Sequence, residues 1–397
     1  MSARRPARRS KREIISRRVG RVSPSGIRKF FDLLSTMDDA ISLGVGEPDF
    51  VTPWHISEAG ISGIEKGYTM YTSNWGMPEL RQELARNLAA RCGVEYDTDR
   101  ELLITVGVSE GLDLAMRAVL NPKDEVISPE PTYVSYESCT VLAEGVFVPV
   151  PTTVENQFRV KAADIEERVT SRTKAILLGY PNNPTGAVME RADLEEIADV
   201  ARRHDLLVIS DEIYDQLVYG IKHTCFASLP GMKERTIFLG GFSKAYAMTG
   251  WRIGYAAAPA EIIDAMTKIH QYTIMCVPIM AQMAAIEALK SGEAAVREMV
   301  ADYDRRRRVM VKGLNAIGLS CFEPKGAFYA FPSVKVTGLS SQDFAERLLL
   351  EERVAVIPGS AFGDSGEGYV RCCYATALDD IREALRRMRR FVQRHRL

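Results

Sequence analysis

The sequence has no apolar run that approaches the roughly 20 residues needed to cross a bilayer. It also has no excess of either charge, because 51 lysines and arginines stand against 52 aspartates and glutamates, for a formal net charge of −1. Its seven cysteines are widely spaced and include no C-x-x-C pair. These absences argue against a membrane protein, a nucleic-acid-binding protein, a zinc site and a disulfide framework, and they favour a reduced, cytoplasmic protein.

The first 21 residues depart from this balanced composition. Residues 1–21 contain nine lysines and arginines and a single acid, Glu13. Such a segment predicts a solvated basic tail, and a targeting sequence or a nucleic-acid-binding arm is the alternative.

From about residue 100, short apolar runs alternate with segments of helical period, a pattern typical of an α/β sheet covered on both faces. Strands are predicted at residues 101–106, 124–127, 174–179, 206–210 and 236–239. Two helices are indicated by apolar residues at helical spacing, namely Leu112, Ala115, Met116 and Val119, and then Leu194, Ile197, Ala198 and Ala201. Sheets of this kind are mostly parallel and bind ligands at the carboxyl ends of their strands.

The two ends of the chain look different from this middle part, because they mix longer helices with short strands. A final helix is indicated by Ile381, Leu385, Met388 and Val392, again at helical spacing. We therefore expect both ends to combine into a smaller α+β domain. The expected segments are a basic tail at 1–21, the small domain at 22–50 and 291–397, and the large domain at 51–290.

The most informative segment is residues 241–254, which read G-F-S-K-A-Y-A-M-T-G-W-R-I-G. Lys244 follows the strand predicted at 236–239, and a lysine at such a strand end can form an imine with an aldehyde if its amine is partly neutral. Arg252 offers a planar fork suited to a phosphate dianion. In isolation, a G-x-S-K sequence is more often a surface lysine in a loop.

This segment resembles, position for position, the lysine signature of the class I aminotransferases of pyridoxal 5′-phosphate (PLP) fold type I. The resemblance extends from about residue 15 to the C-terminus and is strongest to the branch that contains bacterial-type aspartate and archaeal aromatic aminotransferases. It implies a large domain with a mostly parallel central sheet and a smaller α+β domain formed by both chain ends. It also implies PLP bound to Lys244 as an imine, with Ser243 and Arg252 among the cofactor-binding residues.

The resemblance assigns roles to residues on three further motifs. Asp211, which follows a buried strand, would pair with the pyridine nitrogen and keep it protonated, so that the ring withdraws electrons. Tyr214 and Asn183, the latter in the turn N-N-P-T-G, would donate to the phenolic oxygen of the ring. Without the resemblance, Asp211 would be read as a helix cap and the Asn183 segment as a plain turn.

The phosphate and the ring face of the cofactor would meet other segments. Val108, Ser109 and Glu110 resemble the phosphate loop of the family, where backbone N–H groups at a helix start bind the anion. Tyr133 would stack on the ring. Tyr71 resembles the tyrosine that reaches the cofactor phosphate of the neighbouring subunit, which implies a homodimer with shared active sites.

The substrate end is implied by a second set of residues. Arg371, inside an apolar strand, would clamp the substrate α-carboxylate together with the N–H of Gly46 and with Asn183, and a structural salt bridge is its alternative. Ile27 would belong to an apolar lid. Ser109 stands where aspartate-specific members carry a lysine, and aromatic residues such as Trp75 lie near the expected mouth, so we expect aromatic amino acids to be used, with aspartate as the alternative.

The reaction implied is ping-pong transamination between an L-amino acid and a 2-oxo acid, with 2-oxoglutarate as the expected acceptor. Lys244 would carry the proton from Cα once the amino acid has displaced it. Two alternatives stay open, since a fold does not settle a reaction. One is a PLP-dependent β-lyase or synthase on the same fold. The other is a regulator with a DNA-binding head. Such a head would need a longer segment ahead of the fold than the about 20 residues that precede it here.

Overall fold

The computed structural model describes residues 14–22, 37 and 39–397. Within them, twelve strands form three sheets. The strands are β1 Ile41–Ser42, β2 Leu102–Thr105, β3 Glu125–Glu130, β4 Val146–Pro151, β5 Thr173–Gly179, β6 Leu207–Asp211, β7 Thr236–Gly241, β8 Gly254–Ala257, β9 Tyr329–Ala330, β10 Val354–Ala355, β11 Ile357–Pro358 and β12 Val370–Cys373.

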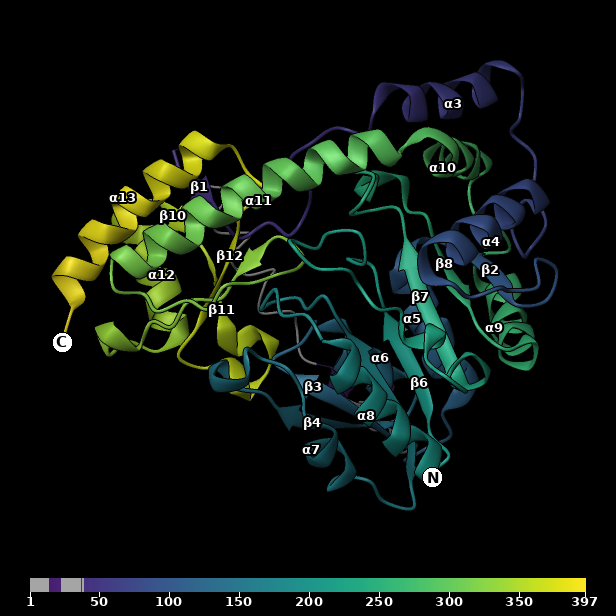
Figure 1. Cartoon of the computed structure of the whole chain (residues 1–397), viewed down its shortest axis with the longest axis horizontal. Coiled ribbons are helices and arrows are strands. Elements are labelled where there is room, and N and C mark those ends of the chain that lie inside the picture. The colour runs from purple at the N-terminus through teal and green to yellow at the C-terminus, as the bar shows by residue number, and fades with distance from the viewer. Residues whose placement is uncertain (1–13, 23–36, 38) are drawn as a thin grey trace, which may run out of the picture.

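The α-helices of the described part surround these sheets (Figure 1). They are α3 Trp54–Glu65, α4 Pro78–Cys92, α5 Gly107–Val119, α6 Ser135–Leu142, α7 Ala162–Glu166, α8 Arg191–Arg203, α9 Ala260–Thr273, α10 Ile279–Ser291, α11 Glu293–Ala316, α12 Ser341–Glu352 and α13 Leu378–His395. No helix in these stretches is both long and apolar enough to span a membrane.

The large domain is built on a seven-stranded sheet in the order β2-β8-β7-β6-β5-β3-β4. Every pairing in it is parallel except those of β8, which runs antiparallel to β2 and β7. Alternate residues of a strand enter different cores: in β6, Ile209 packs with α5 and Val208 packs with α8. Burial on both faces explains why these strands read as continuous apolar runs, and the predicted α/β class is confirmed.

Each strand predicted in the middle of the chain is present, and the two predicted apolar stripes lie on α5 and α8. On α8 the stripe is buried, and the helix begins with a capping box in which Glu190 and Asp193 satisfy each other's backbone N–H groups. Such an amphipathic helix covers one face of the sheet and leaves its charged side to solvent. The strands β4 and β8 of this sheet were not predicted, because β4 contains two prolines and the four residues G-Y-A-A of β8 carry little strand signal.

The small domain joins both ends of the chain, as predicted. β1 pairs in parallel with β10, with Ile41 opposite Val354. β12 lies between β11 and β9 in an antiparallel sheet. The long helix α11 runs from the large domain to this region, and α12 and α13 cover its outer side (Figure 1). The predicted apolar residues of α13 are all buried, whereas the exact domain boundaries stay a prediction.

Candidate active site

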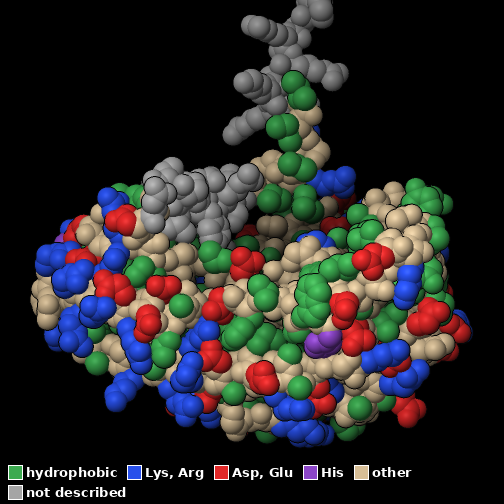
Figure 2. Space-filling model, turned by 90° about the horizontal axis from the view of Figure 1, so that it is seen from above, with side chains coloured by type: hydrophobic (Ala, Val, Ile, Leu, Met, Phe, Trp, Pro, Cys, Tyr) green, Lys and Arg blue, Asp and Glu red, His purple; other side chains and the backbone are tan. Residues whose placement is uncertain are grey.

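A cavity of about 1090 Å³ lies where the carboxyl ends of β3, β5, β6 and β7 meet the small domain. In Figure 2 the surface is hollowed beside the base of the projecting segment 14–22, whose Arg21 and Val22 line the cavity. Most of the predicted site residues line it together: Gly46, Val108, Ser109, Tyr133, Asn183, Asp211, Tyr214, Ser243, Lys244, Arg252 and Arg371. Residues up to 350 positions apart in the sequence, Arg21 and Arg371, therefore meet in one space.

Lys244 lies just beyond the end of β7, inside the cavity. Its Nζ donates a hydrogen bond of 2.7 Å to the Gly46 carbonyl and lies 5.8 Å from the centre of the Tyr214 ring. Burial lowers the pKa of Lys244 from 10.5 to about 8, because desolvation disfavours the ammonium form. Part of the Lys244 population is thus a neutral amine near neutral pH, as a nucleophile or base requires.

Asp211 is the last residue of β6 and is buried. Its Oδ2 accepts a hydrogen bond of 2.9 Å from the Tyr136 hydroxyl, and its Oδ1 accepts one of 3.2 Å from the N–H of Ile213. Burial raises the pKa of Asp211 to about 6, although both hydrogen bonds oppose that rise. The carboxylate lacks an ion-pair partner within the described residues and faces the cavity.

The start of α5 forms one end of the cavity. No side chain caps this helix at Val106, so its first N–H groups are not satisfied by a capping side chain. Arg252 lies against this helix start, since a Cβ on Gly107 would be 2.7 Å from its Nη2, and its Nη1 donates to the Thr249 carbonyl at 2.9 Å. The free amide groups and the guanidinium together suit an anion such as a phosphate.

Arg371 projects from β12 at the small-domain side of the cavity. Its Nη1 donates to Asn183 Oδ1 at 2.8 Å, and its Nη2 donates to the Gly44 carbonyl at 2.6 Å. The guanidinium lies over the rings of Tyr329 and Phe362, at 4.6 Å and 4.9 Å from their centres. Its Nε is buried without a partner, and no carboxylate of the described chain pairs with it. The arrangement favours an anionic ligand over the structural salt bridge considered from the sequence.

Two tyrosines at the cavity were not singled out from the sequence. Tyr329 bonds the Tyr214 hydroxyl at 2.8 Å and donates to the Gly46 carbonyl at 3.4 Å. Tyr136 belongs to the same proline-containing segment as Tyr133 but reaches Asp211 instead. Neither carries a local signal, because an aromatic residue in a strand or after a loop is ordinary core material.

Four predicted residues are not brought into this cavity by the described chain. The Glu110 carboxylate lies outside the cavity lining, where it bonds His270 Nδ1 at 2.7 Å and accepts a hydrogen bond of 2.5 Å from the N–H of Val106. Tyr71 is 79% exposed, and Trp75 packs against the core beside α5. Ile27 lies outside the described residues.

Residues 38–388 match the family described as Aminotransferase class I and II. The Bacillus subtilis (strain 168) protein YugH is 56% identical to this chain over 376 residues, which are 95% of this chain and 97% of that protein. An aspartate aminotransferase of Pyrococcus abyssi is 47% identical, covering 96% of this chain and 99% of its own length.

A solved structure of an aromatic aminotransferase from Pyrococcus horikoshii OT3 matches with a TM-score of 0.88 and 46% identity, over 92% of this chain and 99% of that one. The family match spans most of the chain and includes every residue of the cavity described above except Arg21 and Val22. The chain therefore belongs to the class I and II aminotransferases.

Proposed function

We propose that this aminotransferase uses PLP, held by Lys244, to move an amino group between an L-amino acid and 2-oxoglutarate. The observation that carries the proposal is the meeting in one cavity of three ionisable groups, Lys244, Asp211 and Arg371, that have no ion-pair partner among the described residues. Unpaired buried charges are costly unless a ligand completes them.

The residues present fit PLP at each of its functional groups. The uncapped start of α5 and Arg252 suit its phosphate, with Ser243 in the same lining. Lys244 suits its aldehyde, Asp211 suits its pyridine nitrogen, and Tyr133, which lines the same cavity, would stack on its ring. When bound, PLP supplies an electron-accepting ring that makes the Cα proton of an amino acid removable.

The residues of the chain bind the substrate, transfer the proton and hold the ring. Arg371 binds the substrate α-carboxylate. This carboxylate would supply a hydrogen-bond acceptor for the Arg371 Nε, which has no partner in the described chain. Lys244, partly neutral because of burial, takes the proton from Cα and returns it. Asp211 holds a proton at the pyridine nitrogen. Tyr214 and Asn183 donate hydrogen bonds at the ring oxygen, and the Gly46 N–H contacts the substrate carboxylate.

Borohydride reduction of the protein purified with its cofactor, followed by peptide mapping, tests the assignment of Lys244. We expect the label on the peptide that contains Lys244 and none in the Lys244→Ala variant. A label on another lysine would contradict the assignment. The same preparation, given an amino acid with a leaving group on Cβ, would release ammonia if the protein were a β-lyase, whereas a transaminase forms the corresponding 2-oxo acid.

For the substrate we propose aromatic amino acids, with glutamate or 2-oxoglutarate as partner. Ser109, not a lysine, lines the cavity, and the ring of Phe362 lies beside Arg371. An aromatic side chain would contribute about 2 kcal/mol of discrimination over alanine by burial. Aspartate remains the alternative, and the relatives are named for both substrates.

Of the cations in the lining, Arg21 is the one that we assign to the distal carboxylate of an acidic substrate. It has no ion-pair partner in the described chain, unlike Arg18, which lies 3.7 Å from Glu144. Comparing kcat/KM for phenylalanine and aspartate with 2-oxoglutarate decides the preference. If aspartate is favoured by about a hundredfold, the aromatic proposal is wrong. Arg21→Gln should then lower kcat/KM for aspartate alone, while Arg18→Gln should leave kcat/KM for both substrates unchanged.

We also propose a cytoplasmic homodimer in which Tyr71 completes the site of the partner. Large apolar side chains are exposed on and after α3, in the last turn of α9 and in the segment between α9 and α10, and α3 packs on α10. They are Trp54, Ile61, Ile64, Met70, Tyr71, Tyr272, Ile274 and Met275. Such a surface is typical of an obligate interface. All seven cysteines are free thiols, which fits a reducing compartment.

Mixing Lys244→Ala chains with Tyr71→Phe chains tests the shared site. Each heterodimer then contains one site with both residues intact, so activity should reappear in the mixture although neither homodimer is fully active. A fully active monomer in analytical ultracentrifugation would contradict the proposal.

A further inference from the structure

Tyr136 lies in the first turn of α6, and its ring is buried with 3% exposure. Its hydroxyl donates to Asp211 Oδ2 at 2.9 Å across 75 residues of sequence. Its ring meets that of Tyr133 edge-on, with centroids 5.7 Å apart and an interplanar angle of 85°. Tyr136 thus contacts both Asp211 and Tyr133, two of the residues that we assign to cofactor binding.

The neighbouring strand leaves room for this contact. Gly179, the last residue of β5, is the cross-strand partner of Asp211. A Cβ at Gly179 would overlap the Tyr136 hydroxyl and lie 3.0 Å from two carbons of its ring. The backbone of Gly179 has no positive φ, so conformational freedom does not require glycine there. Space for Tyr136 is therefore the physical reason for a glycine at this strand end.

Asp211 depends on few groups for its anionic form. The charge of Glu212 and burial both disfavour the anion, whereas the Tyr136 hydroxyl, the Ile213 N–H and the charge of Lys244 favour it. Glu212 is itself turned away, toward Ser210 and His223. Of the favourable groups, Tyr136 is the only side chain in the described structure that bonds the carboxylate directly.

We propose that Tyr136 is a positioning residue for transamination, which keeps the Asp211 carboxylate anionic and directed at the pyridine nitrogen of the cofactor. This inference rests on the proposed function, because it assumes that Asp211 faces that nitrogen. Tyr136 itself touches no reacting atom. It acts through Asp211, and it fixes one edge of the Tyr133 ring at the same time.

The test compares Tyr136→Phe with Tyr180→Phe in the holoenzyme loaded with PLP carrying ¹⁵N in its ring. Tyr180 is a matched control, because its buried hydroxyl also donates a hydrogen bond of 2.9 Å, but to the Phe158 carbonyl, away from the cavity. In Tyr136→Phe we expect the ¹⁵N shift to move toward that of unprotonated pyridine. We also expect kcat to fall about tenfold to a hundredfold, the effect of one hydrogen bond to a charged group, with KM little changed. Tyr180→Phe should alter neither quantity.

Gly179→Ala supplies a second variant that keeps the hydroxyl in the chain but displaces it. It should reproduce the ¹⁵N shift of Tyr136→Phe and add little to it in the double variant, because both changes break the same contact. An unchanged ¹⁵N shift in both single variants would overturn the inference, even if their thermal stability fell. If the wild-type protein retained no PLP, the proposed function would fail instead. The ¹³C titration of Asp211 in the apoprotein would still test the Tyr136 contact, which predicts a higher pKa for Asp211 in Tyr136→Phe.

Discussion

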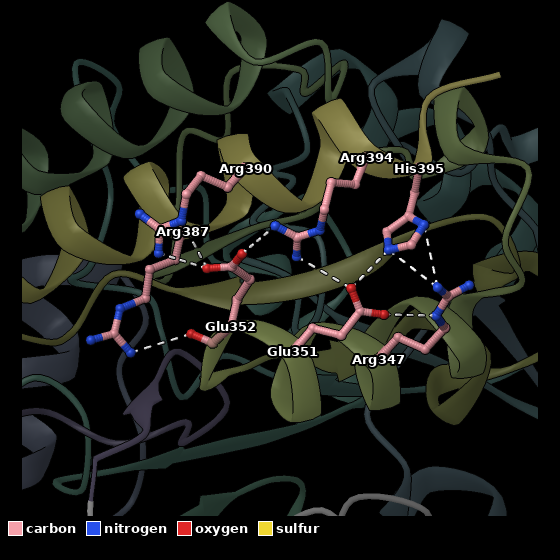
Figure 3. Close-up of polar contacts among 7 residues, drawn as sticks. All are labelled: Arg347, Glu351, Glu352, Arg387, Arg390, Arg394 and His395. Atoms are coloured by element: carbon pink, nitrogen blue, oxygen red, sulfur yellow. Dashed lines mark hydrogen bonds and ion pairs between the residues drawn. The ribbon is translucent and has the colours of Figure 1, made fainter.

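The charged groups of α12 and α13 differ from those of the cavity in how fully they are ion-paired. Between the helices, each carboxylate is shared by several cations (Figure 3). Glu352 bonds Arg390 at 2.6 Å and Arg394 at 2.7 Å, and Glu351 bonds Arg347, Arg394 and His395. In the cavity, by contrast, Lys244, Asp211 and Arg371 have no ion-pair partner among the described residues.

The pKa values record this difference. Hydrogen bonds from His395 and then from two arginines hold the pKa of Glu351 at about 2, so it is charged at every physiological pH. Burial lowers the pKa of Lys244 to about 8 and raises the pKa of Asp211 to about 6, so that it favours the neutral form of both groups. A saturated network holds two helices together, whereas incompletely paired groups in a cavity are available to bind and to exchange protons.

Replacement of the cavity lysine should change the reaction rate more than any other substitution proposed below. Lys244→Ala should slow the amino-acid half-reaction about 10⁴-fold, because both the covalent attachment and the proton carrier are lost. Lys290→Ala, at an exposed lysine 3.7 Å from Glu83, should leave the rate unchanged. Stopped-flow absorbance of the bound cofactor measures both. A wild-type rate in Lys244→Ala would show that the cavity lysine is only structural.

Two arginines, one in the cavity and one between the helices, should respond differently to the same substitution. Arg371→Lys should lower kcat/KM about a hundredfold or more, because an ammonium cannot reproduce the planar fork that bonds Asn183 Oδ1 and the Gly44 carbonyl and still bind a carboxylate. Arg394→Lys, in the α12–α13 network, should leave kcat/KM unchanged and alter stability by less than about 1 kcal/mol. Steady-state kinetics with one amino acid and 2-oxoglutarate checks both variants. Equal losses in the two would remove the distinction.

The apoprotein should be stabilised by removing the buried charge of Asp211. Because the pKa of Asp211 is raised in the folded state, from 3.8 to about 6, the folded chain holds this proton more tightly than the unfolded chain. The carboxylate therefore destabilises the fold increasingly as pH rises from about 4 to about 6, and fully above that. Apo Asp211→Asn should be more stable than wild type by about 2 kcal/mol near pH 7.5 and by little near pH 4. Urea unfolding at the two pH values measures this. A less stable variant near pH 7.5 would contradict the expectation.

The smallest effects are expected in the network. Glu352 is buried, so Glu352→Gln should lower the free energy of unfolding by about 1–2 kcal/mol without changing kcat.

Glu351→Gln should change the free energy of unfolding by less than about 1 kcal/mol, since its pairs are exposed to solvent. Because the folded pKa of Glu351 is depressed, its contribution is present above about pH 4.5 and is lost as pH falls toward about 2. Thermal melts across this range check the sign, and a Glu351→Gln effect that grows on acidification would contradict it.

Much of the architecture could be predicted because local patterns determine it. The apolar runs became strands and the helical stripes became α5, α8 and α13, since both signals depend only on neighbouring residues. The sequence also placed Lys244 beyond a strand and Asp211 at the end of another, and parallel strands bring such ends to one edge. The resemblance carried by residues 241–254 then indicated the family, which the matches confirm.

Local sequence patterns therefore indicate which residues lie at strand ends and which faces are apolar. Which of these residues touch follows from the packing of the whole chain. Tyr136 reaches Asp211 because β5 lies between β3 and β6 and ends in Gly179, and Arg371 reaches Asn183 across 188 residues. Pairing of charges likewise follows from packing, since α12 and α13 are neighbours, whereas no described residue lies at ion-pair distance from Lys244, Asp211 or Arg371. Distances between segments depend on strand order and side-chain packing, which no local pattern encodes.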